Sequence, residues 1–240
     1  ESYDDDIQCT KLIDRCCKYM RESEIGLKKK SLFRISANGI TLDIVKKRLL
    51  SGNPEHLKCI AIGTDDPILN HHSTNDGKHS STDTPAPGSI FQPSTVIVTD
   101  IDTIANILKV CIRYLPEPII PYDEYNILIE GVKQYGSSSD SDCTALKAII
   151  DSTKNTLSKP HVKVLDYVLS FLYEVTMESE TNTMDSENLS RIFSPTFFQI
   201  FIDIKAQKDP MIVFAEVNLG AKIIKNMIDD HSNNAKSGLE

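Results

Sequence analysis

Residues 100–121 read DIDTIANILKVCIRYLPEPIIP and carry the clearest periodicity in the chain. Apolar side chains recur there at steps of three and four residues, which places them on one face of an α-helix. These side chains are Ile101, Ile104, Leu108, Cys111, Ile112 and Leu115. Pro116 then ends the helix, because proline lacks the N–H that a helical hydrogen bond needs and its ring clashes with the preceding turn. The segment predicts an amphipathic helix that stops at a Pro-Glu-Pro corner.

Helical spacing continues on both sides of this segment. We predict further helices over residues 7–21, 42–50, 121–132, 143–157, 162–175, 185–195 and 211–229. Asp185 or Ser186 can cap the helix that runs to Pro195. The alternation typical of a strand is confined to the short run from Thr95 to Val98. The predicted fold class is therefore all-α, a single-domain bundle of about eight or nine helices.

The chain between about residues 65 and 94 has a different composition. From Asn70 to Ser89 it contains scarcely an apolar residue. Such a segment cannot bury enough surface to offset its ordering entropy, so we predict a disordered insertion. Its histidines His71, His72 and His79 are interpreted as solvated side chains, and no metal site is expected. A polar insertion of this kind is suggestive of a fungal protein.

Composition excludes several classes of function. The formal net charge of −8 argues against general nucleic-acid binding. No stretch reaches the ~18–20 unbroken apolar residues of a membrane span, and the acidic first residues lack the apolar core of a signal peptide. None of the six cysteines is spaced as CxxC, which favours reduced, buried thiols over a disulfide framework or a zinc site. We expect a cytoplasmic protein, which regions outside this chain could recruit to the cell cortex or membrane.

The signatures of self-contained catalysis are absent. The sequence has no Walker A loop, no GxGxxG, no GxSxG and no HExxH. It therefore offers no recognisable site for bound nucleotide, hydride transfer or metal-assisted hydrolysis. Any chemistry in which the chain takes part is expected to occur on a partner.

Three segments occur in a fixed order: KSLFRISAN at 30–38, LKVCIRYLPEPIIP at 108–121 and MDSENLSRIFSPTFF at 184–198. They resemble the three motif blocks of the Rho GTPase-activating protein (RhoGAP) domain family. Those blocks are similar to G-[LIV]-[FY]-R-[IVL]-S-G, to LLK-x-[YF]-[LF]-R-x-LPEPL-[LI]-P and to NLAxxFxP. The likeness covers nearly the whole chain. It departs from the family where Ala37 and Ser194 replace glycine.

The resemblance implies a domain that accelerates GTP hydrolysis by a small GTPase of the Rho, Rac or Cdc42 class. It implies that Arg34 is the catalytic residue, inserted in trans into the partner as an arginine finger. Lys109 and Arg113 match a basic pair that supports the finger loop and contacts the partner. Asn188 matches an asparagine that hydrogen-bonds this loop or a switch segment of the GTPase.

The same resemblance implies that the chain is no enzyme on its own. No cofactor is expected, because GTP and Mg²⁺ belong to the partner GTPase, and we expect a monomer. A guanidinium suits the finger role because its planar, permanent charge can meet the negative charge that develops on the transferring phosphate. Phe33 and Ile35 would anchor the loop on either side of Arg34.

Two other interpretations remain open at this point. The chain could be a non-catalytic GTPase-binding or scaffolding module with the same fold, or a helical interaction domain unrelated to GTPases. Taken alone, Arg34 would be a surface arginine paired with a carboxylate. Its occurrence together with Lys109 and Arg113 favours the active domain, since a binding module needs no transition-state cation.

Overall fold

The computed structural model describes residues 3–37, 39–65, 94–136, 140–200 and 210–237. Within these ranges the chain forms ten helices and one pair of short strands, and the predicted all-α class is confirmed. The helices are α1 (Tyr3–Glu22), α2 (Gly39–Leu50), α3 (Pro54–Lys58), α5 (Ile101–Arg113), α6 (Tyr122–Tyr135), α7 (Asp140–Thr156), α8 (Lys159–Met177), α9 (Ser179–Asn182), α10 (Ser186–Phe197) and α11 (Pro210–Ser237). The short helices α3 and α9 add to the eight segments that the periodicity predicts.

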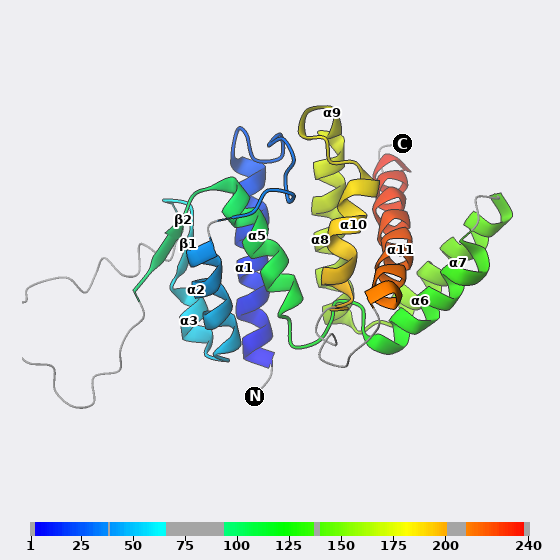
Figure 1. Ribbon diagram of the computed structural model, residues 1–240, viewed down its shortest axis with the longest axis horizontal. Coiled ribbons are helices and arrows are strands. Elements are labelled where there is room, and N and C mark those ends of the chain that lie inside the picture. Colours follow the sequence, from blue (N-terminus) through cyan, green and yellow to red (C-terminus); the bar gives the residue numbers. More distant parts are fainter. Residues whose placement is uncertain (1–2, 38, 66–93, 137–139, 201–209, 238–240) are drawn as a thin grey trace, which may run out of the picture.

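Two groups of helices lie side by side (Figure 1). One contains α1 and α5, flanked by α2, α3 and the strands; the other contains α8, α10 and α11, with α6 and α7 extending away at the far end. Helix α10 joins the groups, because it packs against α5 as well as against α8 and α11. The connection from α1 to α2, residues 23–37, lies at the same end of the groups as α9.

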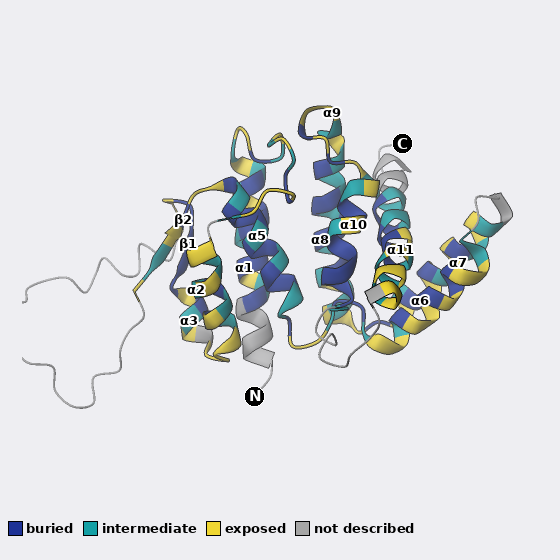
Figure 2. Ribbon diagram, in the orientation of Figure 1, coloured by how far each residue is buried: buried dark blue, intermediate teal, exposed yellow. Residues whose placement is uncertain are grey.

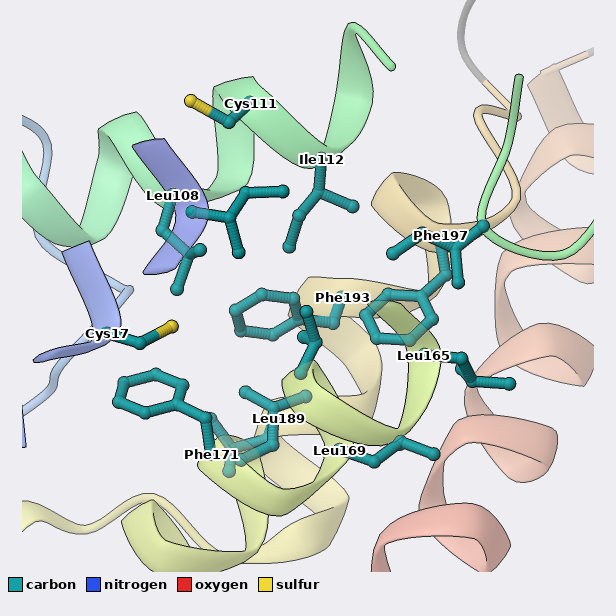
Figure 3. Close-up of a cluster of buried hydrophobic side chains, with 14 of the residues drawn as sticks. Cys17, Leu108, Cys111, Ile112, Leu165, Leu169, Phe171, Leu189, Phe193 and Phe197 are labelled. Atoms are coloured by element: carbon teal, nitrogen blue, oxygen red, sulfur yellow. The ribbon is translucent and has the colours of Figure 1, made fainter. Parts of the chain in front are cut away.

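The apolar core fills the space between these groups, and the buried residues line their facing sides (Figure 2). At its centre Phe193 of α10 lies between Leu108 and Ile112 of α5 and the side chains of α8 (Figure 3). Phe171 of α8 lies close to Cys17 of α1. The predicted apolar face of residues 100–115 therefore meets the second helix group.

Two of the predicted helices begin directly after an aspartate whose side chain caps the first turn. Asp100 caps α5, where its carboxylate accepts from Thr103 N at 2.8 Å. Asp185 caps α10 by accepting from Asn188 N at 2.7 Å, which satisfies a backbone donor that the helix itself leaves unpaired. The prediction that this helix ends at Pro195 is wrong by one half-turn, because α10 contains Pro195 and runs to Phe197.

The parallel strands β1 (Ile60–Ile62) and β2 (Val96–Val98) pair at the outer edge of the first helix group (Figure 1). Sequence alternation marks only the second strand, because all three residues of β1 are buried and show no period of two. Two arginines, the half-buried Arg15 and the buried Arg48, support this corner: Arg15 Nη1 donates to Ile60 O and Arg48 Nη1 to Cys59 O, each at 2.7 Å.

Cysteine burial agrees largely with the sequence prediction. Five thiols are buried and that of Cys143 on α7 is exposed; all six are free. The predicted insertion falls on residues 66–93, with its histidines, and lies outside the described residues. In the ranges that the structure describes, no helix is long and apolar enough to cross a bilayer.

Candidate functional site

Arg34 lies on the connection between α1 and α2, here named the Arg34 loop (residues 23–37). Ser31 and Phe33 both have positive φ, 58° and 71°, a conformation that disfavours residues with a Cβ. Leu32 and Phe33 are buried, whereas Ile35 is 41% exposed. The prediction of apolar anchors on both sides of Arg34 is therefore right for Phe33 and wrong for Ile35.

The buried ring of Phe33 holds the loop against the core. It packs edge-on against Phe193 of α10, with ring centroids 4.9 Å apart, and against Phe171 of α8 at 6.4 Å. Such aromatic pairs stabilise by about 0.5–1.5 kcal/mol beyond the area they bury. This gain offsets the left-handed backbone at Phe33, which costs roughly 1–3 kcal/mol. The loop conformation therefore depends on the core beneath it.

Asn182, at the end of α9, is a second support that sequence reasoning missed. Its side chain is fully buried and donates to Leu27 O and Val175 O, each at 2.8 Å, while its Oδ1 accepts from Met184 N at 2.6 Å. Its backbone carbonyl accepts from Ser31 N at 2.8 Å. One asparagine thus joins the Arg34 loop to the turn between α8 and α10.

The guanidinium of Arg34 is exposed and meets Asn188 at the start of α10. Nη2 donates to Asn188 Oδ1, and Asn188 Nδ2 donates to Thr183 O at 3.3 Å. Within the described part of the chain, Arg34 forms no ion pair with a carboxylate. A neutral amide therefore holds the cation, and a partner need not break a salt bridge to take it.

Lys109 of α5 reaches the backbone beside Arg34. Its Nζ donates to Phe33 O at 2.8 Å. Burial, together with the charge of Arg113 one turn along the helix, lowers the pKa of Lys109 to about 8. Arg113 is half-buried. The structure therefore brings Arg34, Lys109 and Asn188 together around one loop, with Arg113 beside Lys109.

Raising the pH should stabilise the parent protein relative to a Lys109→Met variant. The pKa of Lys109 is about 8 in the folded protein and 10.5 ordinarily, so between these values the unfolded state binds more protons. The contribution of Lys109 to the free energy of unfolding is therefore lowest below pH 8 and rises toward pH 10.5. Urea unfolding of both proteins at about pH 7 and about pH 9.5 measures this change. A parent-to-variant difference that stays constant with pH would contradict a buried ammonium at this position.

Comparison with known proteins assigns the fold and the family. The RhoGAP domain model matches residues 83–201, which include Lys109, Arg113 and Asn188. Rho GTPase-activating protein 25 of Mus musculus is 26% identical over 140 residues, and beta-chimaerin of Mus musculus is 36% identical over 106 residues. The chain belongs to the RhoGAP domain family.

The part of each relative that matches this RhoGAP chain is less than a third of that relative's length. The alignments cover 58% and 44% of this chain but 20% of protein 25 and 30% of beta-chimaerin. Solved structures match it over most of its length. Human Rho GTPase-activating protein 15 has a TM-score of 0.61 at 18% identity, with 92% of this chain and 81% of that chain covered.

The BH domain of Graf, the GTPase regulator associated with focal adhesion kinase, has a TM-score of 0.59 at 17% identity. The match covers 94% of this RhoGAP chain and 93% of the Graf domain chain. At 17% identity the likeness shows the fold alone. Arg34 lies outside the residues that the family model matches. Its connection to the matched residues is structural, through Lys109 and Asn188.

Proposed function

We propose that this RhoGAP domain accelerates GTP hydrolysis by a small GTPase of the Rho, Rac or Cdc42 class, and that Arg34 acts in trans as an arginine finger. One observation carries the proposal. An exposed guanidinium lies on a loop whose backbone is fixed to α5 and to the core, and among the described residues its side-chain hydrogen bond is to the neutral amide of Asn188. The loop is thus rigid at its base and available at its tip.

The chemistry asked of Arg34 is electrostatic. As the γ-phosphoryl group moves from GTP to water, negative charge develops on its oxygens, and a guanidinium placed there stabilises the transition state. The bond from Arg34 to a phosphate oxygen is charge-assisted on both sides and stronger than the bond to Asn188. Transfer of Arg34 from Asn188 to the phosphate is therefore favourable. GTP and Mg²⁺ belong to the partner, so this chain requires no cofactor in the proposal.

Lys109 and Asn188 support this transfer, the first through the backbone of the Arg34 loop and the second through the guanidinium. Lys109 fixes the carbonyl of Phe33, which shares its peptide group with the nitrogen of Arg34. Asn188 holds the free guanidinium near the position from which it extends. We propose that Arg113, at the end of α5, adds positive charge on the face that meets the GTPase. We also propose that the domain acts as a monomer.

Single-turnover GTP hydrolysis by Rho, Rac and Cdc42 proteins, with and without the chain, tests the proposal. We expect an acceleration within the ~10³–10⁵-fold range of arginine fingers for at least one of them. GDP with aluminium fluoride should strengthen the complex, because the finger's contacts form fully only against transition-state charge. Binding of the GTP form without any acceleration would favour the alternative, a non-catalytic GTPase-binding or scaffolding module.

A further inference from the structure

Three polar side chains on one face of α5 contact the Arg34 loop. Asp102, Asn106 and Lys109 are spaced by four and three residues, which places them on a common helical face. The Asp102 carboxylate lies 3.3 Å from Lys29 Nζ, Asn106 Nδ2 donates to Ile35 O at 2.9 Å, and Lys109 Nζ donates to Phe33 O at 2.8 Å. Helix α5 therefore holds the loop at three successive points.

Two of these contacts flank Arg34 itself. Lys109 binds the carbonyl of the residue before it, and Asn106 binds the carbonyl of the residue after it. We propose that Asn106 is a positioning residue for Arg34, which fixes the downstream side of the loop so that the guanidinium is aimed at the partner's phosphate. This inference rests on the proposed function.

The two sides of Arg34 are supported in different ways. On the upstream side the peptide is held by two bonds, Arg34 N to Ser31 O at 2.9 Å and Lys109 to Phe33 O, above the buried ring of Phe33. On the downstream side the Ile35 side chain is 41% exposed and does not belong to the buried core. The backbone just after Arg34 is therefore held by the hydrogen bond from Asn106 Nδ2 to Ile35 O.

A second hydrogen bond holds the Asn106 side chain in the orientation that this role requires. Its Nδ2 also donates to Asp102 O, one turn back in α5, at 2.7 Å. The amide of Asn106 thus donates one hydrogen bond within α5 and one to the Arg34 loop. The two bonds together fix the orientation of the side chain. Because Arg34 must meet the transition state within a fraction of an ångström, freedom at Ile35 lowers the rate rather than the affinity.

The test compares Asn106→Ala with Asn226→Ala. Asn226 of α11 is a matched control: it is also half-buried and its Nδ2 also donates to a carbonyl one turn back, Lys222 O, at 2.8 Å, with no contact to the Arg34 loop. We expect Asn106→Ala to lower the maximal single-turnover rate at saturating domain by about three- to tenfold, the equivalent of one hydrogen bond. The half-saturating concentration should change little, and Asn226→Ala should match the parent.

Asn106→Leu separates the hydrogen bond from side-chain bulk, since it keeps the volume but removes both donors. It should lose as much rate as Asn106→Ala, with the helical circular dichroism of the parent. In an Arg34→Ala background, loss of Asn106 should have no further effect, because the positioned group is gone. An unchanged maximal rate, an effect on half-saturation alone, or an equal loss in the Arg34→Ala background would each overturn the inference.

The same experiment keeps this inference apart from the proposed function. If Arg34→Ala abolishes acceleration while both Asn106 variants retain the full rate, the finger stands and the positioning role fails. If Arg34→Ala has no effect, the proposed function itself fails.

Discussion

Arg34→Ala should lower the rate of activated GTP hydrolysis by about 10³–10⁵-fold while much of the binding to the GTP-bound partner remains. The reason is that a finger interacts with charge that exists only in the transition state, so its removal raises the barrier more than it weakens the ground-state complex. Single-turnover hydrolysis measures the rate, and titration with a GTPase loaded with a non-hydrolysable nucleotide measures the binding.

Arg34→Lys should restore little of this activity. Lysine carries the charge but not the planar fork of donors that can contact two phosphate oxygens together. Lys133→Ala provides the control for loss of one surface cation, because Lys133 lies on α6 and pairs with Glu130, away from the Arg34 loop. That variant should behave as the parent. Parent-like acceleration by Arg34→Ala would remove Arg34 from the mechanism, whatever the fold.

Phe193→Ala should destabilise the domain by about 3–5 kcal/mol. Phe193 is fully buried and its ring packs against those of Phe33 and Phe197, so truncation leaves a cavity where α10 meets the base of the Arg34 loop. Urea unfolding followed by circular dichroism gives the change in the free energy of unfolding.

Phe214→Ala is the matched control for this substitution. Phe214 lies in α11 and is 64% exposed, so its truncation removes few buried contacts and should change stability by less than about 0.5 kcal/mol. Equal losses for the two variants would mean that the cluster around Phe193 is not the core of the domain. A stable Phe193→Ala that also retained full GTPase activation would show that Phe33 does not need the ring of Phe193 to hold the Arg34 loop.

Much of the helical framework follows from local sequence. The three- and four-residue spacing from Ile101 to Ile112 marks the buried face of α5, and Asp185 marks the start of α10. The sequence reveals this spacing and this cap because each involves residues within one or two helical turns of one another. Arg34, Lys109 and Asn188 were singled out through the family resemblance, and the structure places them around one loop.

The supports of that loop could not be predicted in the same way. Asn182 and Asn106 look like ordinary polar residues of a turn and of a helix surface, since their bonds join parts of the chain 155 and 71 residues apart. The positive φ of Phe33 is equally invisible, because it results from burial against α8 and α10 rather than from a glycine. Strand β1 was missed because burial on both faces removes the alternation that identifies a strand.

The side-chain hydrogen bonds that join the Arg34 loop to α5 and α10 span long stretches of chain. The bond to Asn188 joins residues 154 apart and that to Lys109 joins residues 76 apart. Closing such loops costs entropy that only the assembled helices repay, so the loop acquires its geometry after α5, α8 and α10 have packed. A refolding sample can therefore recover its helical signal before it can stimulate a GTPase. Stimulated hydrolysis, followed in time, would report the completion of tertiary assembly in this domain.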